Sequence, residues 1–78
     1  MRKTKNIQID YLKDVYAFSA MANTCFTEVE IRSGNNCNDG KSIMGLFAID
    51  PSRTFTVEYD SSETAFEDFI NQFEVFSI

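Results

Sequence analysis

Three stretches of the chain alternate between polar and apolar residues, which is the pattern of a strand with one buried face. They are residues 5–9, 28–32 and 54–59. In the last stretch every apolar or aromatic side chain stands at an odd position, so its two faces differ completely in polarity. We therefore expect Phe55, Val57 and Tyr59 to point toward helices that cover the sheet, and Thr54, Thr56 and Glu58 to lie on its open face.

Two other stretches repeat apolar residues at helical spacing. In the first, the apolar positions follow one another at steps of four, three, four and three, which predicts a helix over about residues 12–25 with one stripe on a core. In the second, they stand at i, i+3, i+4 and i+7, which predicts a final helix whose start is capped by side chains of residues 60–63. The two predicted core stripes are Tyr11, Val15, Phe18, Ala22 and Cys25, and Phe66, Phe69, Ile70 and Phe73.

Turn residues divide the middle of the chain into short elements. Residues 33–36, Ser-Gly-Asn-Asn, include types that tolerate positive φ, so a hairpin into a short strand around Cys37 and Asn38 is expected. After Asp39-Gly40, Ser42 can cap a short apolar helix that ends before Asp50-Pro51. The predicted order is strand, helix, strand, strand, helix, strand, helix, which is typical of an α+β fold with helices on one face of an antiparallel sheet.

The length of the chain favours one domain over residues 1–78, because 78 residues leave room for a single core. Apolar residues make up 44% of the chain and eight of them are Phe, which is enough burial for it to fold alone. No apolar run approaches the roughly 18 residues that a membrane span needs, and no apolar signal segment follows the basic first residues. We expect a cytoplasmic protein without membrane insertion.

The charges are unevenly distributed. Seven bases and twelve acids give a formal net charge of −5, which argues against a nucleic-acid partner. Residues 1–53 contain all the bases and half of the acids, whereas residues 54–78 contain the other six acids and no base. This acidic last third is expected to be a solvated face.

The chain contains no histidine and only two cysteines. It therefore lacks the base of a catalytic triad, the common zinc ligand and the usual phosphate-carrying imidazole. Cys25 and Cys37 are too few for a disulfide framework or a four-ligand zinc site, so we expect reduced thiols that fill space. Only carboxylates, thiols, lysine and tyrosine are left for catalysis, which argues against most mechanisms of small enzymes. We expect a protein that is not an enzyme, with no catalytic residue, no metal and no cofactor.

One segment resembles a known family. Residues 39–47, Asp-Gly-Lys-Ser-Ile-Met-Gly-Leu-Phe, resemble the regulatory-serine segment of HPr, the small phosphocarrier of the bacterial phosphoenolpyruvate-dependent sugar phosphotransferase system. The resemblance covers essentially the whole chain, because the element order, the hairpin before the segment and the aromatic-rich last helix stand where that family has them. It implies an HPr-like open-faced β-sandwich of order βαββαβα, with strand order 1-4-2-3 and three helices on one face of the sheet.

The resemblance also shows a departure at the phosphate-carrying site. The family's histidine falls near Tyr11, and a phenol forms a stable phosphate ester that cannot be passed onward with a similar driving force. Lys13 stands near the family's arginine but lacks its bidentate fork. Asp10 and Asp14 add negative charge where a phosphate would need donors. The chain is thus similar to the HPr-like proteins of Gram-positive bacteria that lack the histidine, including catabolite-repression paralogues that keep only the serine.

Ser42 admits two interpretations. As a plain helix N-cap it would contribute on the order of 1 kcal/mol. The resemblance adds a second role, a regulatory phosphorylation site beside an apolar helix. It implies that this helix docks partner proteins, although its apolar residues could instead be wholly core; the implied docking residues are Lys41, Ile43, Met44 and Phe47.

These observations predict a non-enzymatic, HPr-like docking or regulatory protein. Its implied partners are proteins of the phosphotransferase system or an HPr kinase/phosphorylase. Three alternatives stay open: a functioning sugar-transport phosphocarrier, against which the missing histidine argues; a divergent phosphocarrier that uses another residue; and a small acidic interaction module unconnected with sugar transport.

Overall fold

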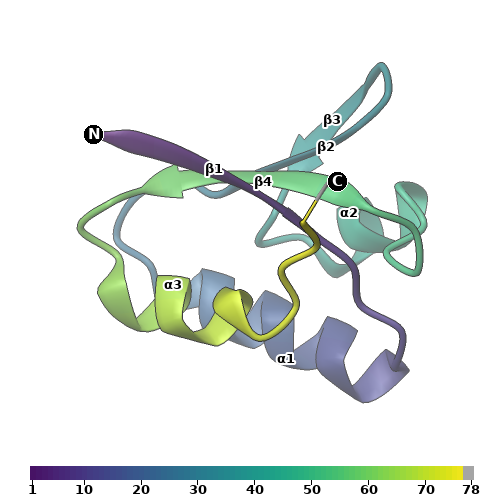
Figure 1. Cartoon of the computed structure of the whole chain (residues 1–78), viewed down its shortest axis with the longest axis horizontal. Coiled ribbons are helices and arrows are strands. Elements are labelled where there is room, and N and C mark those ends of the chain that lie inside the picture. Colours follow the sequence, from purple (N-terminus) through teal and green to yellow (C-terminus); the bar gives the residue numbers. More distant parts are fainter. Residues whose placement is uncertain (77–78) are drawn as a thin grey trace.

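The computed structural model describes residues 1–76 and has its elements in the predicted order. The four strands form one layer, and the helices lie on one side of it (Figure 1). The predicted α+β class and the βαββαβα order are therefore confirmed. The elements are β1 (Arg2–Ile7), α1 (Leu12–Asn23), β2 (Glu30–Ser33), β3 (Asn36–Asp39), α2 (Ile43–Ala48), β4 (Phe55–Asp60) and α3 (Thr64–Asn71).

The sheet has the order β1-β4-β2-β3, as the resemblance implies, and each pair of neighbours is antiparallel. β4 lies between β1 and β2, with Val57 opposite Lys5 on one side and Ile31 on the other. The β2–β3 hairpin turns at Gly34, whose φ of +58° is a conformation that glycine adopts without steric cost. The predicted hairpin is confirmed.

The core lies between β4 and the helices. Phe55, Val57 and Tyr59 are all buried, as the alternation along β4 predicts. Phe18 of α1 connects the layers, because its ring lies 6.1 Å from that of Phe55 and 5.5 Å from that of Phe66 on α3. Edge-to-face aromatic pairs of this kind add to the stabilisation from burial.

Both ends of α1 differ from the prediction. Tyr11 occupies the N-cap position in an extended conformation and is 67% exposed, so the expectation that it faces the core is wrong. The helix ends at Asn23 rather than near Cys25, although Cys25 is buried in the following loop. The buried stripe of α1 is therefore limited to Val15, Phe18 and Ala22.

The strands are shifted relative to their predicted ranges because pairing with neighbours decides where they begin. β1 pairs with β4 from Arg2 opposite Asp60 to Ile7 opposite Phe55, rather than over residues 5–9. Ile9 is still buried, but it has left the sheet and its N–H donates to the carbonyl of Pro51 at 2.8 Å. β2 begins at Glu30, two residues later than expected.

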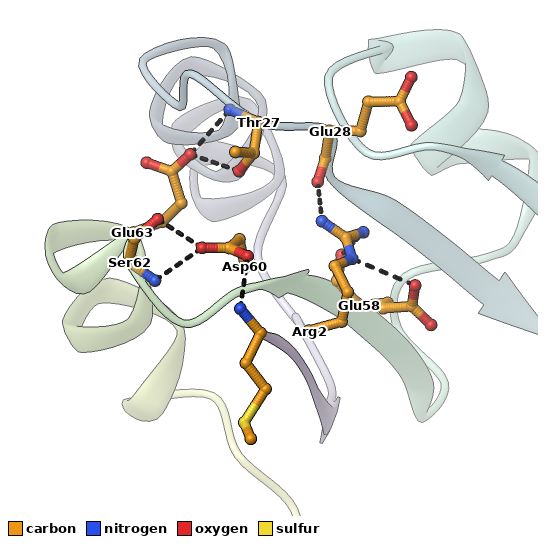
Figure 2. A network of polar contacts seen from close by, with 8 residues as sticks. Arg2, Thr27, Glu28, Glu58, Asp60, Ser62 and Glu63 are labelled. Atoms are coloured by element: carbon orange, nitrogen blue, oxygen red, sulfur yellow. Dashed lines mark hydrogen bonds and ion pairs between the residues drawn. The ribbon is translucent and has the colours of Figure 1, made fainter.

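The last helix is confirmed, but not its predicted cap. Glu63 is the N-cap residue of α3 and makes no side-chain cap bond. Its carboxylate instead accepts hydrogen bonds from the backbone N–H and the hydroxyl of Thr27, the N–H at 2.8 Å (Figure 2). These bonds lower the pKa of Glu63. Of the four predicted core residues of this helix, Phe66 and Ile70 are buried, whereas Phe69 and Phe73 are partly buried against the core.

Most acids of the last third are in ion pairs with bases at the start of the chain or on β2. Lys3 Nζ lies 2.9 Å from Glu67, Lys5 Nζ lies 3.4 Å from Glu74, and Arg2 and Arg32 each lie 3.3 Å from Glu58. Asp60 pairs with the ammonium group of Met1 at 3.0 Å (Figure 2). The acids of the last third are therefore at the surface, as expected, and most of them are in ion pairs or hydrogen bonds, whereas Asp68 is exposed with no ion pair among residues 1–76. Among residues 1–76, no helix combines the length and the apolar character that a membrane span requires.

Candidate docking site

Ser42 caps α2 as predicted. Its backbone is extended, with φ of −94° and ψ of 122°, and its Oγ accepts a hydrogen bond from the N–H of Gly45 at 3.1 Å. The N–H of Ser42 in turn donates to the carbonyl of Asp39, at the end of β3, at 3.1 Å. The serine hydroxyl therefore lies at the junction of the sheet and α2, and the residue is partly exposed.

The apolar residues of α2 are divided between the core and the surface. Leu46 is buried and Ile43 packs partly against the core. Met44 is 79% exposed and Phe47 is 45% exposed. Residues 43–48 include no charged side chain, so the outer surface of this helix is wholly uncharged.

Lys41 joins the start of α2 to the end of α1. Its Nζ donates to the carbonyl of Cys25 at 3.1 Å, and its own carbonyl accepts from the side-chain amide of Asn23 at 2.9 Å and the hydroxyl of Ser19 at 3.3 Å. These contacts hold α2 beside α1. The ammonium group of Lys41 is thus engaged in a structural bond.

Helix α1 extends the exposed apolar surface in a way that the sequence analysis missed. Leu12 and Tyr16 are both more than half exposed, and the rings of Tyr16 and Phe47 form a T-shaped pair with a centroid distance of 6.1 Å. Leu12 and Tyr16 stand four residues apart and outside the buried stripe of α1, and this spare apolar spacing is the signal that could have identified them. We call Leu12, Tyr16, Met44 and Phe47 the α1–α2 face.

Tyr11 borders a shallow hollow at the N-terminal end of α1. Asp10, Asp14 and Glu74 also line this hollow, and no basic residue does. Asp10 accepts a hydrogen bond from the side chain of Gln8 at 3.1 Å, and Glu74 pairs with Lys5. Three carboxylates make the hollow a poor place for a phosphate group, because an anion needs N–H donors or positive charge.

Neither cysteine is activated. Burial raises the pKa of Cys25, and a hydrogen bond from the thiol of Cys37 to a carboxylate oxygen of Glu30, at 2.6 Å, raises the pKa of Cys37. Thiolates are the nucleophilic and metal-binding form, so both residues are poor nucleophiles near neutral pH. Within residues 1–76, no three His, Cys, Asp or Glu side chains are grouped so that they could hold a metal ion.

Comparison with known proteins finds matches among solved structures. No family model matches the chain, and no curated protein matches it. Among solved structures, the phosphocarrier protein HPr from Bacillus anthracis str. Ames has a TM-score of 0.70 at 20% identity, over 95% of this chain and 96% of that one.

Two further structures agree. HPr-C-His from Thermoanaerobacter tengcongensis has a TM-score of 0.68 at 17% identity, over 92% of this chain and 88% of that one. The histidine-containing phosphocarrier protein of Mycoplasma has a TM-score of 0.66 at 15% identity, over 92% and 89%. All three similarities extend over nearly the whole chain. The chain therefore has the fold of the HPr phosphocarrier proteins.

Proposed function

We propose that this chain is an HPr-like regulatory protein that works by docking other proteins on the α1–α2 face rather than by carrying phosphate. The observation that supports this most is the contiguous exposed pair Tyr16 and Phe47, with Met44 on the same uncharged helix as Phe47. A soluble domain gains nothing in its own folding from large apolar side chains left in water, and such patches are typical of interaction sites.

The N-terminal end of α1 argues against a carrier. The chain has no histidine, and the residue nearest the family's phosphate-carrying position is Tyr11, beside a hollow lined by carboxylates. A phosphoryl group arriving there would meet Asp10, Asp14 and Glu74. The divergent-carrier alternative has no nucleophile at this end that is placed among positive charges.

Ser42 is the proposed point of regulation. Its hydroxyl is partly exposed and caps the same helix that presents Met44 and Phe47. A phosphate there would add about two negative charges next to the docking surface. The partners that fit this proposal are proteins of the phosphotransferase system or an HPr kinase/phosphorylase.

The first prediction tests this proposal with an HPr kinase and labelled ATP. We expect the kinase to label the wild-type chain but not Ser42→Ala. Met44→Asp should weaken labelling because it places a charge in the apolar face and leaves Ser42 intact. Phe26→Asp is the matched control, since Phe26 is 99% exposed but lies outside the α1–α2 face. It should be labelled like the wild type.

Two outcomes would change the assignment. If the kinase ignores the wild-type chain while labelling a genuine HPr, Ser42 is only a helix cap and the unconnected interaction module is favoured. If phosphoenolpyruvate and enzyme I leave an acid-labile phosphate on the chain, a divergent phosphocarrier is favoured instead. A plain serine phosphate is stable in acid, so the two chemistries are easily separated.

A further inference from the structure

Most of the basic side chains are paired with acids of β4, of α3 or of the segment that follows α3. Arg2, Lys3, Lys5 and Arg32 are in ion pairs with Glu58, Glu67 and Glu74. The ammonium group of Lys41 is bonded to the carbonyl of Cys25. Of the seven bases, this leaves Lys13 and Arg53 without such a partner among residues 1–76.

By contrast, three acids near the α1–α2 face have no basic partner among residues 1–76. Asp10 and Asp14 stand at the N-terminal end of α1, and Asp50 follows α2. The two loops that bear Asp10 and Asp50 are joined by the hydrogen bond from Ile9 to Pro51. Within residues 1–76, none of these three carboxylates is in an ion pair.

Carboxylates outnumber bases at the N-terminal end of α1, where Asp10, Asp14 and Glu74 stand against Lys13 and the Glu74-paired Lys5. The hollow beside Tyr11 is lined by three carboxylates and no base, and only one of them, Glu74, has a lysine partner. Leu12 of the α1–α2 face and Tyr11 of the hollow both lie at the N-terminal end of α1, so a partner that covers this end of the helix can contact both. An exposed tyrosine ring can also contact a cation through its face.

We infer that the α1–α2 face binds a partner whose contact surface is apolar at its centre and places an arginine or lysine side chain in the carboxylate-lined hollow beside Tyr11. The inference rests on the proposed function, because it assumes that this face docks proteins. It specifies the chemistry of the partner: the end of the face where an HPr carrier would hold a phosphate accepts a cation here. Phosphorylation of Ser42 should then strengthen binding, because it adds negative charge to a face that selects a basic partner.

The experiment uses two helical peptides with the same Leu and Phe face as probes. The first peptide has Lys at all positions outside that face, and the second has Glu at the same positions. Each is titrated into the isotope-labelled full chain, and the amide shifts in the NMR spectrum give both affinity and location. We expect the Lys peptide to bind about tenfold more tightly than the Glu peptide at low ionic strength, with a smaller advantage in high salt.

Charge variants locate the preference. Asp10→Asn combined with Asp14→Asn should lower the affinity for the Lys peptide several-fold. The matched control is Glu28→Gln combined with Asp68→Asn, which removes the same charge from exposed residues outside the face and the hollow and should change the affinity less. Phe47→Ser should weaken the binding of both peptides, because it removes an apolar contact that both peptides make.

The outcomes separate this inference from the proposed function. If Phe47→Ser weakens both peptides but the Glu peptide binds as well as the Lys peptide, the face docks proteins and the charge inference is wrong. Equal effects of the two charge-removal variants would also overturn it, since the preference would then arise from net charge alone. If neither peptide shifts amides of α1 and α2, the docking face itself is wrong.

Discussion

Gly40 is the residue at which the turn before α2 approaches the core most closely. Its N–H donates to the carbonyl of Val29 at 2.7 Å. A Cβ atom at Gly40 would lie 2.6 Å from Cγ1 of Val29, which is buried, and 3.1 Å from the Val29 carbonyl oxygen. This contact fixes the turn that leads into Ser42.

We predict that Gly40→Ala destabilises the protein by about 1–3 kcal/mol through overpacking. Urea unfolding followed by circular dichroism measures this change. Gly34→Asn is the control, because Gly34 has open space around it and a positive φ that Asn tolerates. If Gly40→Ala is no less stable than Gly34→Asn, the turn is not held against Val29.

Tyr11, near which the resemblance to HPr places the family's histidine, contributes to the fold through its backbone. The first turn of α1 is closed by the backbone of Tyr11, whose carbonyl accepts from the N–H groups of Asp14 at 2.9 Å and Val15 at 3.2 Å. The tyrosine side chain makes no cap bond. The side chain at this position can therefore differ without loss of the helix start, because the helix start depends on the main chain of this residue.

Among the elements, β4 has the central place in the fold. It pairs with β1 on one side and β2 on the other, and its buried side chains face the helices. Phe55 is 2% exposed and meets Phe18 of α1. Removing this ring would leave a cavity between the sheet and α1.

We expect Phe55→Ala to lower the free energy of unfolding by roughly 3–5 kcal/mol, a large part of the stability of a small domain. Chemical unfolding again provides the measurement. Thr54→Ala, just before the strand and exposed, should change stability little. A loss below about 1 kcal/mol for Phe55→Ala would mean that the Phe55 ring contributes little to the core.

The elements with strong local periodicity were predictable from the sequence, and those defined by distant partners were not. β4 and α3 have a regular pattern of their own, and Ser42 and Gly34 are of residue types that favour the caps and turns they form. The first residues of β1 are basic and polar, and they form a strand because β4 lies beside them. Glu63 could not be identified as a bond acceptor, since its partner Thr27 is 36 residues away.

The candidate site divides in the same way. Exposed Met44 and Phe47 follow from the apolar character of a very short helix, which cannot bury every side chain. The contribution of Tyr16 depends on how α2 lies across α1, and Lys41 fixes that arrangement through Cys25, Ser19 and Asn23. The apolar spacing along α1 could have indicated that Tyr16 is exposed, but not that it contacts Phe47.

At the scale of the whole molecule, hydrogen bonds and ion pairs join the two ends of the chain. Asp60 and Glu67 are bound by groups of the first strand or its start, and Glu63 by the loop after α1. Hydrogen bonds from the hydroxyl of Ser62 to Asp60, of Thr27 to Glu63 and of Tyr59 to Glu67 are the main causes that lower the pKa values of these carboxyl groups. The folded state thus favours their ionised forms.

This arrangement predicts how stability depends on pH. A carboxyl group with a lowered pKa in the folded state stabilises the fold fully above its unfolded pKa, about 4, and loses that contribution as the pH falls through its folded pKa. The free energy of unfolding should therefore be nearly constant between about pH 7 and pH 5 and should decrease below about pH 4. Urea unfolding at a series of pH values measures it.

The hydroxyl donors provide the control for this acid loss. Thr27→Val combined with Tyr59→Phe removes the hydroxyl donors to Glu63 and Glu67 and leaves both carboxyl groups in place, together with their bonds to the N–H of Thr27 and to Lys3. The pKa values of these two groups should then return toward their ordinary range, so the variant, although less stable at neutral pH, should lose less further stability on acidification. If wild type and variant lose the same amount between about pH 5 and pH 3, the acid dependence arises from ion pairs such as Lys3 with Glu67 and not from the hydroxyl bonds.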